Sequence, residues 1–295
     1  MDKVKLDSKE DQVFSGRPKK VSWERLWTFS GGPFSLTGWP KKNIHTDPEF
    51  AKNCGLPCMA ASATQYMGYV AELMIDIFGV QWLSQGTSDL KFIAVVDAGD
   101  TLVTKAQIKG KEVQGISARF TLDVWCENQK GAKVLVGSAT GVVGNGNFPP
   151  IKPSLDKGDV KSAPLLTPFE YLLTPELNQQ YLYAEEDFHA WYVEQTEFGS
   201  PIGHPGLLLN MSNGPRSPSF RLGPGEAGFH SRDETFFLHP ARVGKKMKVI
   251  WKWIGTYEKR GRPYRLSASV VVDEDGVEIM KRLVHATVAS KQYQK

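Results

Sequence analysis

The chain has 295 residues, of which 41% are hydrophobic and 23% charged, and its formal net charge at pH 7 is +4. This length exceeds the usual size of one domain, so we expect two domains of ordinary size. No run of Lys and Arg exceeds two residues, which argues against a nucleic-acid-binding surface. The polar N-terminus and the lack of an uninterrupted apolar stretch predict neither a signal peptide nor a membrane span, so we expect a cytoplasmic protein.

The cysteines predict neither a disulfide framework nor a metal site. The chain has only three, Cys54, Cys58 and Cys126. Cys54 and Cys58 are four residues apart, but no second Cys or His pair follows nearby. We therefore expect unpaired, buried thiols.

The first stretch with the character of a site is "GWPKKNIHTDPEFA", residues 38–51. His45 is an imidazole that suits proton transfer, yet none of the five residues before it is acidic. Asp47 precedes Pro48, which predicts a helix N-cap followed by a short helix. The alternative for His45 is an imidazole that only stabilises this turn.

A longer helix is expected over residues 60–78, followed by four strands. Met67, Val70, Met74 and Ile77 recur at nearly helical spacing. The segments that follow are rich in β-branched and aromatic residues and are bounded by Gly, Asp and Asn, which predicts strands. These strands are expected at residues 90–96, 100–110, 115–129 and 133–143.

The same order of elements returns about 145 residues later. Pro57 and Pro201 are 144 positions apart, whereas the glycine pairs 99/244 and 131/276 are each 145 apart. A second set of strands is expected at 234–243, 247–260, 263–273 and 278–289, the last two joined by the turn "DEDG". We infer an internal duplication, with units at 1–144 and 167–295 and a Pro-, Gly- and Lys-rich linker at 145–166.

One helix followed by a long antiparallel meander predicts an α+β unit. Its sheet has to wrap around the helix so that both apolar faces are buried. Each unit alone leaves sheet surface and a strand edge uncovered, and pairing the two units would cover them.

This wrapped helix, its duplication and the segment "NIHTDPEFA" resemble the MaoC-like (R)-specific enoyl-CoA hydratase and dehydratase superfamily, in its double hot-dog branch. "FIAVVDAGDTL" at 92–102, "PIGHPGLLL" at 201–209 and the hairpin at 257–276 are similar to further motifs of that family. The resemblance implies a tandem hot-dog fold, in which each half is an antiparallel sheet wrapped around a central helix.

The family motif is Asp, any residue, Asn, Pro, an aliphatic residue and His, and both units depart from it. His45 matches the motif His, but Pro40 stands five residues before it and Lys42 takes the Asn position. In the second unit, "EEDFHAWYVE" places Asp187 at the Asp position, whereas His189 and Tyr192 take the Asn and His positions. The first unit thus keeps the His without the Asp, and the second keeps the Asp without the His.

The resemblance implies a hydratase or dehydratase, a hydro-lyase that acts on an enoyl-CoA or a 3-hydroxyacyl-CoA. Coenzyme A or a carrier would enter as part of the thioester substrate, with no separate cofactor. The catalytic candidates are His45, Asp187 and His189, the last two as a replacement acid–base pair. Backbone N–H groups at the helix starts 59–62 and 203–206 would bind the thioester oxygen. The substrate-binding candidates are Asn43, Ala61, Tyr192, His204 and Gly206.

Alternatives remain open for several of these residues and for the function. Glu185, Glu186 and Asp187 would ordinarily form a solvated face, and Tyr192 would ordinarily be a packing residue. Four basic residues near the late hairpin could bind a coenzyme phosphate or only keep a strand edge soluble; they are Lys259, Arg260, Arg262 and Arg265. The other functions considered are thioester hydrolysis and a non-catalytic acyl-CoA-binding or structural subunit. The latter would associate with a partner enzyme, and a homodimer is also possible.

Overall fold

The computed structural model describes residues 2–31, 42–144, 148–149, 151, 165–221 and 227–289. Its strands are β1 (Val13–Ser15), β2 (Lys19–Lys20), β3 (Thr87–Phe92), β4 (Thr101–Gln114), β5 (Ser117–Asn128), β6 (Lys133–Val143), β7 (Phe169–Leu172), β8 (Ala227–Phe237), β9 (Lys246–Lys259), β10 (Arg262–Asp273) and β11 (Glu278–Ala289). Its α-helices are α1 (Trp23–Ser30), α2 (Pro48–Asn53), α3 (Ala63–Phe78), α4 (Trp82–Gln85), α6 (Pro175–Glu185) and α7 (Pro205–Met211). Two short 3₁₀ helices are η2 (Ala190–Tyr192) and η3 (Gly214–Arg216).

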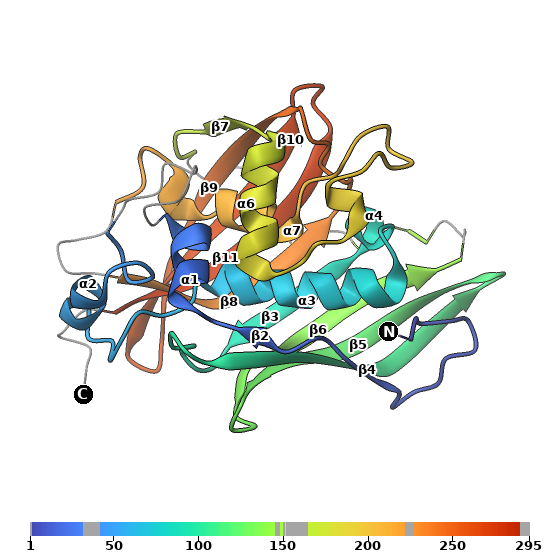
Figure 1. Cartoon of the computed structure of the whole chain (residues 1–295), viewed down its shortest axis with the longest axis horizontal. Coiled ribbons are helices and arrows are strands. Elements are labelled where there is room, and N and C mark those ends of the chain that lie inside the picture. Colours follow the sequence, from blue (N-terminus) through green and yellow to red (C-terminus); the bar gives the residue numbers. More distant parts are fainter. Residues whose placement is uncertain are drawn as a thin grey trace.

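All the strands join one antiparallel sheet that has two similar halves. The strand order is β1-β4-β5-β6-β3-β8-β11-β10-β9-β7, with β2 paired to β4 outside this path. The order β4-β5-β6-β3 on one side of the centre is mirrored by β9-β10-β11-β8 on the other, and β3 pairs with β8 between them. The sheet is therefore built from an N-terminal unit (β3–β6 around α3) and a C-terminal unit (β8–β11 around α7), as Figure 1 shows. The predicted double hot-dog fold is confirmed.

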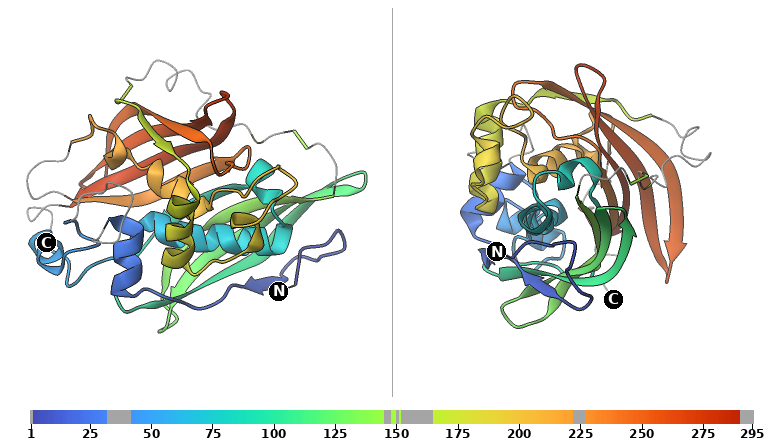
Figure 2. Two further views of the ribbon diagram at one scale, coloured as in Figure 1. Left: turned by 45° about the horizontal axis from the view of Figure 1, so that its top comes forward. Right: turned by 90° about the vertical axis from the view of Figure 1, so that its right-hand side faces the viewer.

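The central helix α3 is enclosed on almost all sides. Fourteen of its 16 residues are buried, as expected for a helix that has no solvent-facing side. On the facing strand β4, inward and outward residues alternate, and Leu102, Ala106 and Ile108 point into the core. The sheet curves around α3 and α7. The right-hand view in Figure 2 looks nearly along the axis of α3 and shows this curvature.

Helices α1 and α6 lie on the open side of the curved sheet and pack against each other (Figure 2). The ring centroids of Phe29 on α1 and Tyr181 on α6 are 5.1 Å apart, in an edge-to-face arrangement. The sequence pattern did not predict these two helices. Helix α1 belongs to the N-terminal half of the chain and α6 belongs to the C-terminal half. Their contact therefore joins the two halves at a second place, apart from the β3–β8 pairing.

The central strand pair begins and ends at other residues than the pattern predicts. The strand expected at 90–96 runs from Thr87 to Phe92, and the strand expected at 234–243 runs from Ala227 to Phe237. Residues 93–96 therefore leave the ladder beside the start of α3. The linker expected at 145–166 lies mostly outside the described residues, so the boundaries of the two units remain a prediction. Within the described part of the chain, no helix is long and apolar enough to cross a membrane.

Candidate functional site

A cavity of about 440 Å³ lies where the two units meet. We call it the inter-unit cavity. The N-terminal unit lines it with His45, with Ala60–Ala63 at the start of α3 and with residues 92–96, and the C-terminal unit adds residues 228–231 of β8. Arg262, Tyr264 and Thr287 contribute to its rim.

His45 presents one ring nitrogen to this cavity. Its Nδ1 lies 2.7 Å from the carbonyl oxygen of Ala60. A carbonyl oxygen only accepts, so Nδ1 carries the proton and the lone pair lies on Nε2, for which no hydrogen-bond partner is found among the described residues. Burial lowers the pKa of His45 to about 4, although the hydrogen bond to Ala60 acts in the opposite direction. The imidazole is therefore neutral at pH 7 and is a proton acceptor at Nε2.

The turn that carries His45 is fixed by its own side chains. Asp47 Oδ1 accepts a hydrogen bond of 2.8 Å from Phe50 N, which confirms it as the N-cap of α2. Asn43 Oδ1 accepts one of 2.8 Å from His45 N, and Asn43 Nδ2 donates to Ser30 O at 3.0 Å. The predicted substrate ligand Asn43 thus holds the loop together and is not among the cavity-lining residues.

The start of helix α3 opens into the same cavity. Its N-cap, Ser62, makes no side-chain capping bond, and Ser62 Oγ lies 2.9 Å from Thr64 Oγ1 instead. Ala61 N is engaged with Val96 O at 2.8 Å, whereas no acceptor for the N–H groups of Ser62 and Ala63 is found among the described residues. Ala61, Ser62 and Ala63 all line the cavity. Free N–H groups at the positive end of a buried helix favour a negative oxygen.

The matching helix start in the C-terminal unit is closed. His204 is the N-cap of α7, and its Nδ1 accepts a hydrogen bond of 3.1 Å from Gly206 N. Its other nitrogen, Nε2, lies 3.1 Å from Asp187 Oδ2 and donates to it. Both side chains are almost fully buried. The imidazole therefore occupies the N–H group that a ligand would need.

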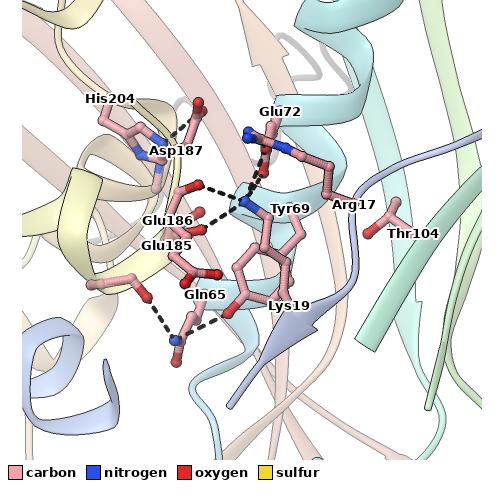
Figure 3. A network of polar contacts seen from close by, with 12 residues as sticks. Arg17, Lys19, Gln65, Tyr69, Glu72, Thr104, Glu185, Glu186, Asp187 and His204 are labelled. Atoms are coloured by element: carbon pink, nitrogen blue, oxygen red, sulfur yellow. Dashed lines mark hydrogen bonds and ion pairs between the residues drawn. The ribbon is translucent and has the colours of Figure 1, made fainter. Parts of the chain in front are cut away.

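Asp187 belongs to a cluster of ionisable side chains, shown in Figure 3, in which Lys19, Glu72, Asp187 and His204 are buried and Arg17 is exposed. Lys19 Nζ lies 2.7 Å from Glu72 Oε2 and donates to the backbone oxygens of Glu185 and Glu186, each at 2.9 Å. Burial by itself would raise the pKa of Asp187, but the hydrogen bond from His204 and the charges of Lys19 and Arg17 outweigh it, so the pKa is lowered. The solvated face considered for these acids is wrong for Asp187 and Glu185, since only Glu186 is exposed.

Beside this cluster, Glu185 fills a space that two glycines leave open. A Cβ at Gly68 on α3 or at Gly206 on α7 would collide with its carboxyl group. The side chain is fully buried, and neither of its oxygens has a hydrogen-bond partner among the described residues. Burial, together with the neighbouring Asp187, raises the pKa of Glu185 well above its usual value. Gly206 therefore makes room for Glu185, where the sequence suggested room for a ligand.

The remaining sequence candidates lie apart from the inter-unit cavity. Asp187 pairs with His204 and not with His189, whose ring stacks on Trp191 with centroids 3.7 Å apart. Tyr192 is buried, with its ring centroid 4.8 Å from that of His204, which agrees with the packing role considered for it. Of the eight candidates, only His45 and Ala61 line the cavity.

The sequence did not single out His230, the second imidazole of the cavity. It lies on β8 of the C-terminal unit, with its ring centroid 5.9 Å from that of Phe92. Its position in "AGFHSRDET" matches no motif, and only the pairing of β3 with β8 brings it next to the N-terminal unit. Burial lowers the pKa of His230 to about 4, with Arg282 and His45 acting in the same direction and Asp233 opposing them.

A second cavity of about 480 Å³ carries none of this chemistry. It lies beside α4, between β3 and β8, and its wall includes Arg119, Phe148 and Phe236. None of the sequence-predicted site residues lines it. Trp82 of α4 is buried, with its ring centroid 4.7 Å from that of Phe237 on β8, so aromatic side chains pack here across the junction of the two units.

Comparison with known proteins agrees with this architecture. Residues 36–124 match the model of the MaoC like domain family. A dehydratase of the MaoC-domain type from Chloroflexus aurantiacus J-10-fl superposes with a TM-score of 0.69 at 13% identity, covering 96% of each chain. A Mycobacterium tuberculosis protein described as a double hot-dog fold gives 0.65 at 14% identity, covering 96% of this chain and 97% of its own.

A third similar structure is longer than this chain. The peroxisomal multifunctional enzyme type 2 of Drosophila melanogaster superposes with a TM-score of 0.61 at 14% identity. The match covers 93% of this chain but 48% of that enzyme. No curated protein sequence matches the chain. The protein thus has the double hot-dog fold, and residues 36–124 of its N-terminal half are similar to the MaoC like domain.

Proposed function

We propose that the protein is a hydratase or dehydratase that adds water to, or removes water from, an acyl thioester bound in the inter-unit cavity. The substrate class is an enoyl thioester, or the 3-hydroxyacyl thioester in the reverse direction, carried by coenzyme A or a carrier protein. One observation carries the proposal. The free Nε2 of His45 and the uncapped start of α3 face the same cavity.

In this proposal, one imidazole handles both proton transfers. His45 Nε2 takes a proton from water while the water oxygen forms a bond to Cβ of the enoyl group. The Cα–Cβ π electrons shift toward the thioester and produce an enolate. Its oxygen is stabilised by the N–H groups of Ser62 and Ala63, which are already oriented before the charge develops. The protonated His45 then returns the proton to Cα on the same face, so one water is added and the imidazole is neutral again.

The walls and the rim of the cavity suit the two ends of such a substrate. Phe92, Ile93, Val95 and Phe229 provide apolar surface for an acyl chain. Arg262, one of the basic residues near the late hairpin, is exposed at the rim, where a phosphate of coenzyme A or of a carrier arm would pass.

Hydration of crotonyl-CoA, followed by loss of the enoyl absorbance, tests the proposal. We expect His45→Gln to lower kcat by about 10²–10⁴-fold, the usual contribution of a general acid–base group, without changing the melting temperature. His239→Gln is the control, because among the described residues this exposed imidazole bonds only to Glu278 O. Equal turnover by His45→Gln and the wild type would remove His45 from the mechanism. Release of free thiol in place of hydration would mean a thioester hydrolase.

A second candidate function is binding of an acyl thioester without turnover. It is favoured by one observation: among the described residues, no Asp or Glu lines the inter-unit cavity. Asp187, the carboxylate that stands at the Asp position of the motif, is instead hydrogen-bonded to His204. Calorimetric titration with crotonyl-CoA distinguishes the two functions. Binding without hydration, even at high protein concentration, would favour the binding subunit.

The pH dependence of activity distinguishes a His45 with a lowered pKa from an ordinary histidine. With a pKa near 4, His45 stays deprotonated from about pH 6 to about pH 8, so kcat/KM should be flat over this range. A base with the usual pKa of about 6.5 would instead lose activity as the pH falls through that value. A drop of severalfold between about pH 8 and about pH 6 would contradict this assignment.

A further inference from the structure

Each unit contributes one imidazole to the inter-unit cavity. The two imidazoles differ in the hydrogen bonding of their ring nitrogens. His45 stands in the turn before α2, whereas His230 comes from β8 across the junction of the units. Both line the cavity, and the charge of one affects the other, so they face a common space. A ligand that reaches His45 therefore also meets a side chain of the C-terminal unit.

The surroundings of His230 indicate which nitrogen serves that ligand. Its Nδ1 is buried and has no hydrogen-bond partner among the described residues. Nε2 is not enclosed in this way, so it is the nitrogen that reaches the cavity. An enclosed N–H without an acceptor is rarer in proteins than an enclosed lone pair without a donor. The favoured tautomer thus leaves the lone pair on Nδ1 and places the proton on Nε2.

The two imidazoles are then complementary. His45 Nε2 offers a lone pair, because its proton is held on Nδ1 by Ala60 O. His230 Nε2 offers an N–H, and its low pKa keeps it neutral at pH 7. A neutral imidazole can polarise a carbonyl group without transferring its proton, as in triosephosphate isomerase. Leaving Nδ1 unpaired costs free energy, which is tolerated more readily at a functional site.

We propose that His230 Nε2–H donates a hydrogen bond to the thioester oxygen, so that the C-terminal unit supplies the electrophile for the base in the N-terminal unit. This inference rests on the proposed hydratase function. It gives the site a second polar group in place of the acid missing near His45. No proton leaves His230 in this step: the hydrogen bond shortens as the oxygen becomes negative, and the proton cycle stays on His45.

The proposal is tested with crotonyl-CoA and three variants. His230→Phe keeps a flat ring beside Phe92 but removes the donor, and we expect kcat to fall about 10²–10³-fold with KM nearly unchanged, as for loss of one oxyanion donor. His230→Gln keeps an N–H donor and should recover part of that loss. His239→Phe is the matched control, an exposed imidazole outside the cavity. Wild-type kcat in His230→Phe, or no recovery in His230→Gln, would overturn the inference.

If His230→Phe does not fold, a spectroscopic measurement can still test whether His230 donates a hydrogen bond to the substrate. In the ¹⁵N-labelled wild type, the Nε2–H signal of His230 should shift when the unreactive butyryl-CoA binds, and His230→Gln assigns that signal. An unshifted signal at saturation would overturn the inference. Failure of the function itself looks different. If the wild type hydrates neither crotonyl-CoA nor longer enoyl-CoAs, the proposed function is wrong, and so is the role proposed for His230.

Discussion

The starts of helices α3 and α7 occupy equivalent places in the two units, yet they have opposite surroundings. At α3 the N-cap Ser62 makes no side-chain capping bond, and the helix start faces a cavity that also receives His45. At α7 the N-cap His204 bonds to Gly206 N and to Asp187, and none of these three residues lines the inter-unit cavity. One helix start is left available for a ligand, and the other is used by the protein itself.

This difference shows how a duplicated fold separates binding from stability. Each N-cap follows the same backbone bond, from Ala61 N to Val96 O in one unit and from Gly203 N to Ala241 O in the other, so Ser62 occupies the position of His204. The small residue leaves room for a ligand at α3, and the imidazole fills the same room at α7. The Asp that the family motif would use beside His45 survives only at position 187, where it pairs with His204 and Lys19 stands nearby. Substitutions around α7 should therefore change stability, whereas those around α3 should change turnover.

The largest effect on stability is expected from Lys19→Met. Lys19 is buried, and it pairs with Glu72 while it binds the backbone oxygens of two residues of the other unit. Its removal leaves a buried carboxylate with less compensation, so the free energy of unfolding should fall by about 3–5 kcal/mol in a urea titration. The double variant Lys19→Met/Glu72→Gln should recover part of the loss. A change below about 1 kcal/mol would show that the cluster does not hold the units together.

A smaller loss is expected when the closed helix start is opened. His204→Ala removes the cap of α7 and the hydrogen bond to the buried Asp187, which are worth about 1 kcal/mol and about 1–3 kcal/mol respectively. We expect a decrease of about 2–4 kcal/mol in the free energy of unfolding and an unchanged kcat per folded molecule. A matching loss of kcat at full stability would mean that the pair takes part in the reaction, and the comparison of the two helix starts would fail.

The pH dependence of stability tests whether Glu185 is protonated in the fold. Burial and Asp187 raise its pKa in the folded state well above the unfolded value. Between these two values the folded chain holds a proton that the unfolded chain releases, so stability falls as the pH rises, by up to about 1.4 kcal/mol per pH unit. Glu185→Gln cannot ionise and should lack this contribution. Urea midpoints measured at about pH 5, 6 and 7 check this, and parallel pH profiles for the variant and the wild type would contradict it.

The sequence predicts the architecture well because the repeat and the apolar periodicity are local patterns. The helix expected at 60–78 forms as Ala63–Phe78, and its later start follows from the bonds of Ala60 and Ala61 to Ile44 and Val96. The N-cap Asp47 is likewise predictable, because it acts within three residues. The turn around His45 is marked by the same segment.

The partners of the site residues are less predictable because they are set by tertiary contacts. His189 lies two residues from Asp187, but the chain turns its ring onto Trp191, and His204 reaches Asp187 instead. Lys19 arrives from a two-residue strand that no pattern marks. His230 becomes part of the cavity only through the pairing of β3 with β8, and a sequence without coordinates does not reveal that pairing.

The smallest effect is expected at the cavity rim, which belongs to the C-terminal unit. Arg262 is exposed there, so its attraction to a phosphate is screened by solvent and is worth about 0.2–1 kcal/mol. Arg262→Gln should therefore raise KM for crotonyl-CoA by roughly 1.5- to 5-fold, leave kcat unchanged and lose its effect at high salt. Lys259→Gln, on the same hairpin but outside the cavity lining, is the matched control. Crotonyl-pantetheine lacks the phosphates and should be used equally by Arg262→Gln and the wild type. A difference that persists with this substrate would mean that Arg262 acts on the acyl group or on the fold and does not bind phosphate.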